Sequence, residues 1–181
     1  MSQFQFRKLP RSLLQPEKQD RLFELGAKFI RAQVEDPMWY PNAERAAAIP
    51  QEAQTVYWLW LFVCEASLNG IEVFILEPLG EHSREVHAAL TAVGAKELVR
   101  RLEAAIPLAR EGPAEFLTLP DQSWFNQFAR VAEFPTLQSI DNAGPRRDAG
   151  PGRFGVYALF DPLRDAADAF IRANEHVLFE D

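Results

Sequence analysis

The pattern of apolar and polar positions along the chain predicts helices over most of its length. Residues 51–68 become apolar on every side from Val56 onward, so we expect a helix that is buried on most sides. Residues 17–35, 82–93 and 95–109 repeat apolar residues every three or four positions, which is typical of amphipathic helices. The sequence therefore predicts an all-α fold of about six to eight helices around a central apolar helix at 51–68.

Prolines and glycines predict where these helices begin and end. Pro16 suits the first turn of the helix at 17–35, and Glu24 and Lys28 are spaced to form an i,i+4 ion pair on it. Asn69-Gly70 should stop the central helix, and Gly94 should stop the helix at 82–93, because glycine accepts the left-handed conformation that ends many helices.

The second half of the chain contains further helix signals. Pro107 should bend or end the helix at 95–109, and another helix is expected at 121–132. Asp161-Pro162 predicts the start of the last helix, as an N-cap followed by proline in the first position. On the outer face of that helix, Asp168 is spaced to pair with both Arg164 and Arg172.

Three segments are less regular. Residues 1–15 read as an extended arm, in which the alternation of Phe4 and Phe6 with polar residues allows a short strand. Residues 71–77 predict a short helix, although their β-branched side chains leave a strand open as an alternative. Residues 141–155 predict a mobile loop. With no repeat and no linker, the whole of residues 1–181 is expected to form one domain.

The charge of the chain is uneven. Its 181 residues carry a net charge of −7, and 48% of them are hydrophobic, as in ordinary globular proteins. Residues 1–40 carry seven basic and five acidic side chains (net +2), residues 41–95 two and seven (net −5), and residues 96–181 ten and fourteen (net −4). Binding to nucleic acid needs a basic face, which is not evident, so we expect a basic protein partner instead. Solubility alone is the alternative explanation of the acidic balance.

The sequence favours a cytoplasmic protein without a membrane segment. The first residues lack the apolar run of a signal peptide. The longest apolar run, Val56 to Cys64, has nine residues, whereas a spanning helix needs about 20. Cys64 is the one cysteine and lies within this run, so we expect a buried thiol rather than a nucleophile, in a reducing compartment.

No metal or cofactor site is predicted. His82 and His87 are five residues apart, about 140° around a helix, so they cannot chelate one ion together. Glu81 and Glu85 share a helix face, but no clear third ligand joins them. These acids at a helix start instead suit the helix dipole.

Two other groups are candidates for chemistry. Glu65 ends the apolar run, where burial could raise its pKa into the range of an acid–base catalyst; the alternative is a structural role at the Asn69-Gly70 turn. A glycine-rich loop carries the basic residues Arg146, Arg147 and Arg153, and it would be the first place to look for an anion site. It lacks the Lys-Ser or Lys-Thr ending of a phosphate-binding loop, so a surface loop is the better interpretation.

Residues 65–106 resemble a bacterial family of small helical proteins classed as a domain of unknown function, whose best-known member is a DNA-mimic protein. Glu65 matches the acidic residue of the family, and residues 68–74 are similar to its Asn/Gly-rich turn, with Gly70 and Phe74 kept. Residues 88–95 are similar to its alanine-rich helix, which ends in a Gly-Ala pair. The resemblance implies an all-α fold, and DNA mimicry in one branch of the family.

Three functions remain open from the sequence. The first is a non-catalytic interaction protein, because no catalytic motif is found and the acidic stretch offers a surface for a basic regulator or toxin. The second is an accessory protein that binds a small ligand or forms a homodimer. The third is an enzyme using Glu65, which requires a concave pocket at that residue. The residues expected to form the acidic surface are Glu72, Glu77, Glu81 and Glu85.

Overall fold

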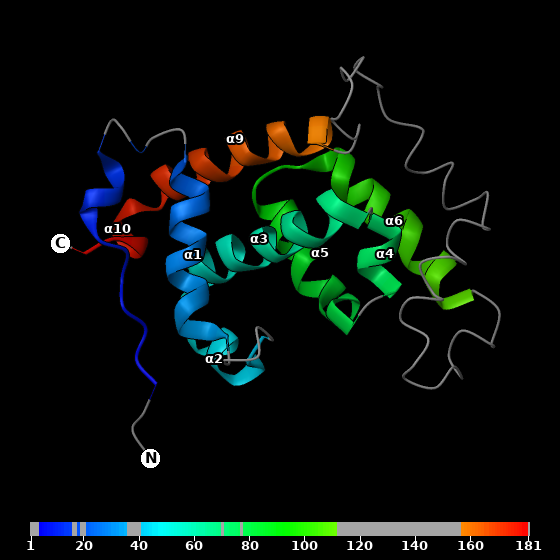
Figure 1. Ribbon diagram of the computed structural model, residues 1–181, viewed down its shortest axis with the longest axis horizontal. Coiled ribbons are helices and arrows are strands. Elements are labelled where there is room, and N and C mark those ends of the chain that lie inside the picture. The colour runs from blue at the N-terminus through cyan, green and yellow to red at the C-terminus, as the bar shows by residue number, and fades with distance from the viewer. Residues whose placement is uncertain are drawn as a thin grey trace.

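The computed structural model describes residues 4–15, 18, 21–35, 41–69, 71–76, 78–111 and 157–180 (Figure 1). Within these ranges the chain is helical, and no strand forms. Two isolated β-bridges occur, one parallel between Leu9 and Phe179 and one antiparallel between Glu35 and Pro41. The predicted all-α fold is confirmed, and the short strand considered for the N-terminal arm is reduced to a single bridge.

The elements, in chain order and with their bounds, are η1 (Arg11–Leu14), α1 (Leu22–Val34), α2 (Ala43–Ala48), α3 (Gln51–Asn69), α4 (Ile71–Leu76), η3 (Pro78–His82), α5 (Ser83–Ala92), α6 (Lys96–Glu111), α9 (Tyr157–Ala173) and α10 (Glu175–Leu178).

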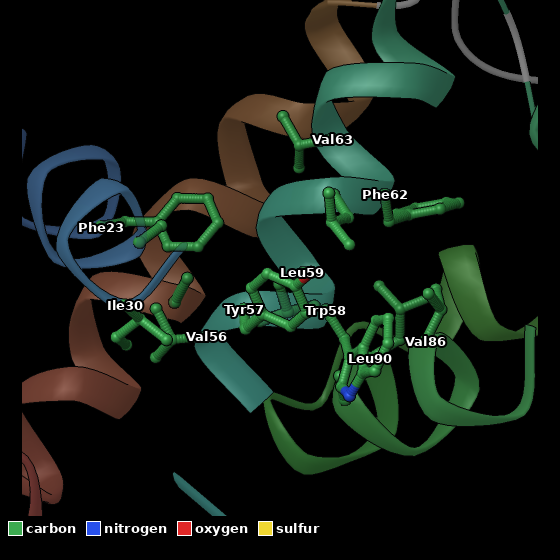
Figure 2. Close-up of a cluster of buried hydrophobic side chains, with 14 of the residues drawn as sticks. Phe23, Ile30, Val56, Tyr57, Trp58, Leu59, Phe62, Val63, Val86 and Leu90 are labelled. Atoms are coloured by element: carbon green, nitrogen blue, oxygen red, sulfur yellow. The ribbon is translucent and has the colours of Figure 1, made fainter. Parts of the chain in front are cut away.

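Helix α3 is the centre of the fold, as its apolar pattern predicted. It contacts α1, α4, α5 and α9 (Figure 1). Figure 2 shows Phe23 and Ile30 of α1 on one side of it, and Val86 and Leu90 of α5 on the other. Because neighbours cover it on several sides, its side chains are buried around most of its circumference.

The start of α1 differs from the prediction. The helix begins at Leu22 rather than at residue 17, and Pro16 and Glu17 lie outside the described residues. Arg21 is the N-cap residue and provides no side-chain cap. The cap comes from a distant helix, because the Phe23 N–H donates to Asp168 Oδ1 of α9 at 2.6 Å. The predicted Glu24–Lys28 pair is confirmed, at 2.6 Å.

The last long helix also differs from the prediction. It begins at Tyr157, one turn before Asp161, so Pro162 lies inside the helix rather than at its first position. A proline there removes one backbone hydrogen bond. Burial of Phe160, whose ring centroid lies 5.7 Å from that of Phe62, offsets this cost. The carboxylate of Asp168, expected on the outer face, reaches α1, where its Oδ1 accepts the Phe23 N–H.

Some of the other helix boundaries agree with the sequence predictions, and others differ from them. Helix α6 continues through Pro107 to Glu111, so the proline does not end it. Gly94 ends α5 with φ +72°, as predicted, and residues 71–76 form a helix rather than a strand. Helix α2 was not predicted; Asn42 caps it by accepting the Arg45 N–H at 3.0 Å. The helix predicted at 121–132 and the loop predicted at 141–155 lie outside the described residues.

The N-terminal arm is held between α1 and the C-terminal segment. The Arg7 backbone exchanges two hydrogen bonds with the buried amide of Gln33, at 2.8 and 3.1 Å. Leu9, fully buried, donates to the carbonyl of Leu178 and accepts from the N–H of Glu180. The arm therefore closes one end of the core without forming a sheet.

Candidate acidic interaction surface

A tight approach between backbones positions Glu81 and Glu85 of the predicted acidic surface. Gly80 lies so close to α4 that a Cβ there would be 2.1 Å from the carbonyl oxygen of Ile75. The chain can therefore turn back along α4 only with glycine at this position. This turn sets the positions of the acids that come after it, Glu81 in η3 and Glu85 in the first turn of α5.

Glu81 and Glu85 differ in how far they reach solvent. The Glu81 side chain is 60% exposed, whereas Glu85 is half-buried. One carboxylate oxygen of Glu85 is buried without a hydrogen-bond partner. Glu81 is thus the better placed of the two to meet a partner. The side chains of Glu72, in α4, and Glu77 lie outside the described residues, so their part in the surface stays a prediction.

His82 anchors this segment to the central helix. Its ring centroid lies 4.7 Å from the Trp58 ring of α3, and only 14% of its side chain is exposed. Its Nε2 is 3.4 Å from Glu81 Oε1, which is within ion-pair distance but not aligned as a hydrogen bond. The stacking on Trp58 fixes the end of η3, and with it the position of Glu81.

Two carboxylates of α6, those of Glu97 and Glu103, have basic partners within the molecule. Glu97 Oε1 lies 2.9 Å from Arg100 and 2.9 Å from Arg101, and hydrogen bonds from Arg100 and Arg101 lower the pKa of Glu97 to about 2. Glu103 lies 2.9 Å from His87 Nε2 of α5. These acids are already engaged within the molecule, so they are poor candidates for binding an external base.

Glu65 and the single cysteine lie side by side in sequence on α3, and both are half-buried. Burial, more than any neighbouring charge, raises the pKa of the Cys64 thiol to about 11, and Glu65 raises it further. A thiol with a raised pKa is a poor nucleophile, which agrees with the expected structural role. The side chain of Asn69 and all of Gly70, Arg146, Arg147 and Arg153 lie outside the described residues.

A buried ion pair at the end of α1 was not predicted from the sequence. The Glu35 side chain is only 7% exposed, and the Arg31 Nε donates to its Oε2 at 2.5 Å. Burial raises the pKa of Glu35, against the lowering effect of Arg31. Burial, and then the charge of Glu35, raise the pKa of Tyr57 far above its usual range. Such a pair was not recognisable because its burial depends on contacts between α1 and other elements.

The described residues contain neither a metal-binding cluster nor a membrane-spanning helix. In those ranges no three His, Cys, Asp or Glu side chains are grouped to hold a metal ion. No helix in the same ranges is long and apolar enough to cross a membrane.

A comparison with protein families gives a match over residues 47–174, described as DMP19-like protein. The chain belongs to the DMP19-like family. The match includes α3 to α6 and the whole of α9, so the resemblance at residues 65–106 is confirmed and extends well beyond them. The arm, η1 and α1 lie outside the DMP19-like match. No curated protein and no solved structure matches the chain.

Proposed function

We propose that this chain is a non-catalytic interaction protein that presents an acidic surface to a basic protein, such as a DNA-binding regulator or a toxin. The acidic surface consists of Glu72, Glu77, Glu81 and Glu85. The observation that carries the proposal is membership of the DMP19-like family, which is named for a DNA-mimic protein.

The distribution of charge supports the same proposal. Residues 41–95 hold the strongest acidic excess of the chain, and the side chain of Glu81 in this segment is 60% exposed. In α6, by contrast, Glu97 forms ion pairs with Arg100 and Arg101. A DNA-binding protein recognises phosphates mainly through Lys and Arg, so exposed carboxylates are the groups that can replace phosphates.

A quantitative capture experiment tests this proposal. The tagged protein would be used at low salt to capture proteins from a lysate of its source organism, followed by mass spectrometry. We expect one basic protein that binds directly after purification, is released by salt, and is displaced by duplex DNA when it is a DNA-binding regulator.

Matched variants locate the surface. In the first, Glu72, Glu77, Glu81 and Glu85 all become Gln, and we expect the partner to be lost. The control neutralises four exposed acids elsewhere, by the substitutions Glu44→Gln, Asp161→Asn, Asp165→Asn and Glu180→Gln. Both variants change the net charge equally, so equal loss of binding, or no recovery of a basic partner, would contradict the proposal.

A further inference from the structure

The N-terminal arm is held by the rest of the chain in the way that a protein holds an extended peptide (Figure 1). The Arg7 N–H donates to Gln33 Oε1 at 2.8 Å, and the Arg7 carbonyl accepts from Gln33 Nε2 at 3.1 Å. Two residues later, the Leu9 N–H donates to the Leu178 carbonyl at 2.8 Å, and the Leu9 carbonyl accepts from the Glu180 N–H at 3.0 Å. Alternate residues of an extended chain turn their backbone groups to the same side, so these bonds hold one edge of the arm.

One buried side chain anchors the arm. Leu9 is fully buried, and a Cβ added to Gly26 of α1 would lie 3.5 Å from Leu9 Cδ1 and 3.9 Å from Ile171 Cδ1 of α9. Leu9 therefore packs where α1 and α9 meet. Main-chain hydrogen bonds combined with a place for one side chain are a recurring mode of peptide recognition. We call Gly26, Gln33, Ile171 and residues 178–180 the arm site.

Two cationic side chains flank this anchor. Lys8 Nζ donates to the carbonyl of His176 at 3.3 Å, and Arg11 Nε donates to the carbonyl of Glu180 at 2.9 Å. Arg7, in contrast, is exposed, and its hydrogen bonds to α1 come from its backbone. The arm site thus favours a basic residue directly before the leucine and another two residues after it.

The charges of the arm and of the remaining chain are opposite. Residues 1–15 carry three basic and no acidic side chains, whereas residues 16–181 carry 16 basic and 26 acidic side chains, a net charge of −10. This excess attracts a basic segment from solution as well as the arm itself.

The arm site lies almost wholly outside the DMP19-like match. Of its residues, only Ile171 falls within residues 47–174. The contacts also do not depend on the covalent connection, since Lys8 and His176 are 168 residues apart in the chain. A segment of similar sequence on another molecule has the groups needed to make the same contacts.

We propose that the arm site binds an extended basic segment of another protein, and that the arm is a built-in competitor for this site. The segment that fits has basic residues one position before and two positions after a leucine, as in residues 8–11. A tethered arm has an effective concentration on the order of 1 mM, so a partner segment must bind tightly or bring further contacts to displace it. No residue of the acidic surface takes part, so this proposal goes beyond the proposed function and does not rest on it.

Titration with a labelled synthetic peptide of residues 4–15 tests the proposal on the full chain, with fluorescence anisotropy as the measurement. The substitutions Lys8→Glu and Arg11→Glu, made together in the chain, weaken the tethered arm and leave the arm site unchanged. We expect the peptide to bind this variant at least about tenfold more tightly than the wild-type chain, whose own arm competes. A peptide with Leu9→Asp should bind neither chain.

A second variant weakens the arm at its anchor. Leu9→Asp in the chain removes the buried leucine, and the unmodified peptide should again bind more tightly than it binds the wild type. Because Leu9 belongs to the core, this variant should melt at a lower temperature, and added peptide should raise its Tm by restoring the leucine from outside.

Matched controls separate the arm site from general effects of charge. Arg7→Glu with Lys96→Glu changes the net charge as much as Lys8→Glu with Arg11→Glu, but at exposed side chains, so peptide binding should stay as weak as for the wild type. Adding Gln33→Ala to the Lys8→Glu, Arg11→Glu variant removes two backbone contacts of the peptide, and its affinity should fall at least about fivefold.

Several results would overturn the proposal. They are no peptide binding to either arm variant, equal binding to the arm variants and the wild type, or binding that ignores Leu9→Asp in the peptide and Gln33→Ala in the chain. Wild-type dimers in sedimentation equilibrium that Lys8→Glu with Arg11→Glu abolishes would assign the arm site to the arm of a second copy instead. The variant with all four acids of the acidic surface changed to Gln should bind the peptide as the wild type does, so the two proposals can fail separately.

Discussion

The cap that α9 places on α1 gives the sharpest prediction. Substituting Asp168→Ala removes the oxygen that accepts the Phe23 N–H at 2.6 Å. No side chain of the N-cap residue Arg21 replaces it. The substitution therefore leaves an N–H at the start of a helix without its acceptor, at a residue whose side chain is buried.

The cost can be estimated from the interactions that are lost. Replacing a capping side chain by Ala costs about 0.5–2 kcal/mol, and removing a negative charge from a helix N-terminus costs about 0.3–1 kcal/mol. These contributions overlap, so we expect Asp168→Ala to lower the free energy of unfolding by about 1–2 kcal/mol. For a chain of this size that corresponds to a fall in Tm of about 2–8 °C. Asp168→Asn keeps an acceptor oxygen and should cost about 0.5 kcal/mol.

Urea denaturation measures this difference. Asp165→Ala is the matched control, because it lies on the same helix, is exposed, and gains the same helix propensity from alanine. We expect the control to stay within about 0.5 kcal/mol of the wild type, and Asp168→Ala to lower the urea midpoint without changing the slope. In hydrogen exchange, the Phe23 amide should lose protection in Asp168→Ala. If both substitutions have equal effects and that amide stays protected, the capping argument is wrong.

Three further predictions concern single residues. Gly80→Ala should lower Tm strongly, because the added Cβ would lie 2.1 Å from the Ile75 carbonyl oxygen. At Gly26 the added Cβ would meet only ordinary contacts, so Gly26→Ala should leave the stability unchanged or raise it by up to about 1 kcal/mol. Equal thermal melts of the two variants would contradict this contrast. The pKa of Glu24 is lowered to about 2 by hydrogen bonds from its two basic neighbours, so its stabilisation is present at neutral pH and is lost as the pH falls from about 4.5 to about 2. The advantage of the wild type over Glu24→Gln, under about 1 kcal/mol for such an exposed group, should therefore shrink between urea titrations at pH 7 and pH 3, and a difference that grows would refute the assignment. The pKa of Cys64 is raised to about 11 by burial, so alkylation at pH 8 should be much slower in the folded chain than in urea, and equal rates would show that the thiol is exposed and reactive.

The local signals in the sequence were reliable where one element decides the outcome. The continuous apolar run after Val56 can be stable only in contact with neighbours on several sides, so it predicted α3 as the centre. Gly94 predicted the end of α5, because its left-handed conformation is unfavourable for other residues. Glu24 and Lys28 predicted their own pair, since the helix spacing alone brings them together.

The candidate site was predictable only in part. The sequence identified an acidic stretch between Glu72 and Glu85, but it could not show that Glu85 turns one oxygen inward while Glu81 stays exposed. That difference depends on the turn at Gly80 and on the stacking of His82 over Trp58. Both are contacts between separate elements, and hydrophobic periodicity carries no information about such contacts.

The sequence by itself determined that the chain is helical, which helix is central, and which stretch is most acidic, because these depend on composition and on residue spacing within one element. The tertiary structure decided where α1 begins, through Asp168, and how far back α9 extends, through burial of Phe160. It also decided that Glu35, at the end of α1, is buried in an ion pair with Arg31. The physical reason is the same in each case: a capping oxygen, a buried ring or an ion pair acts over a few ångströms, and only the folded chain brings residues 23 and 168 within that distance.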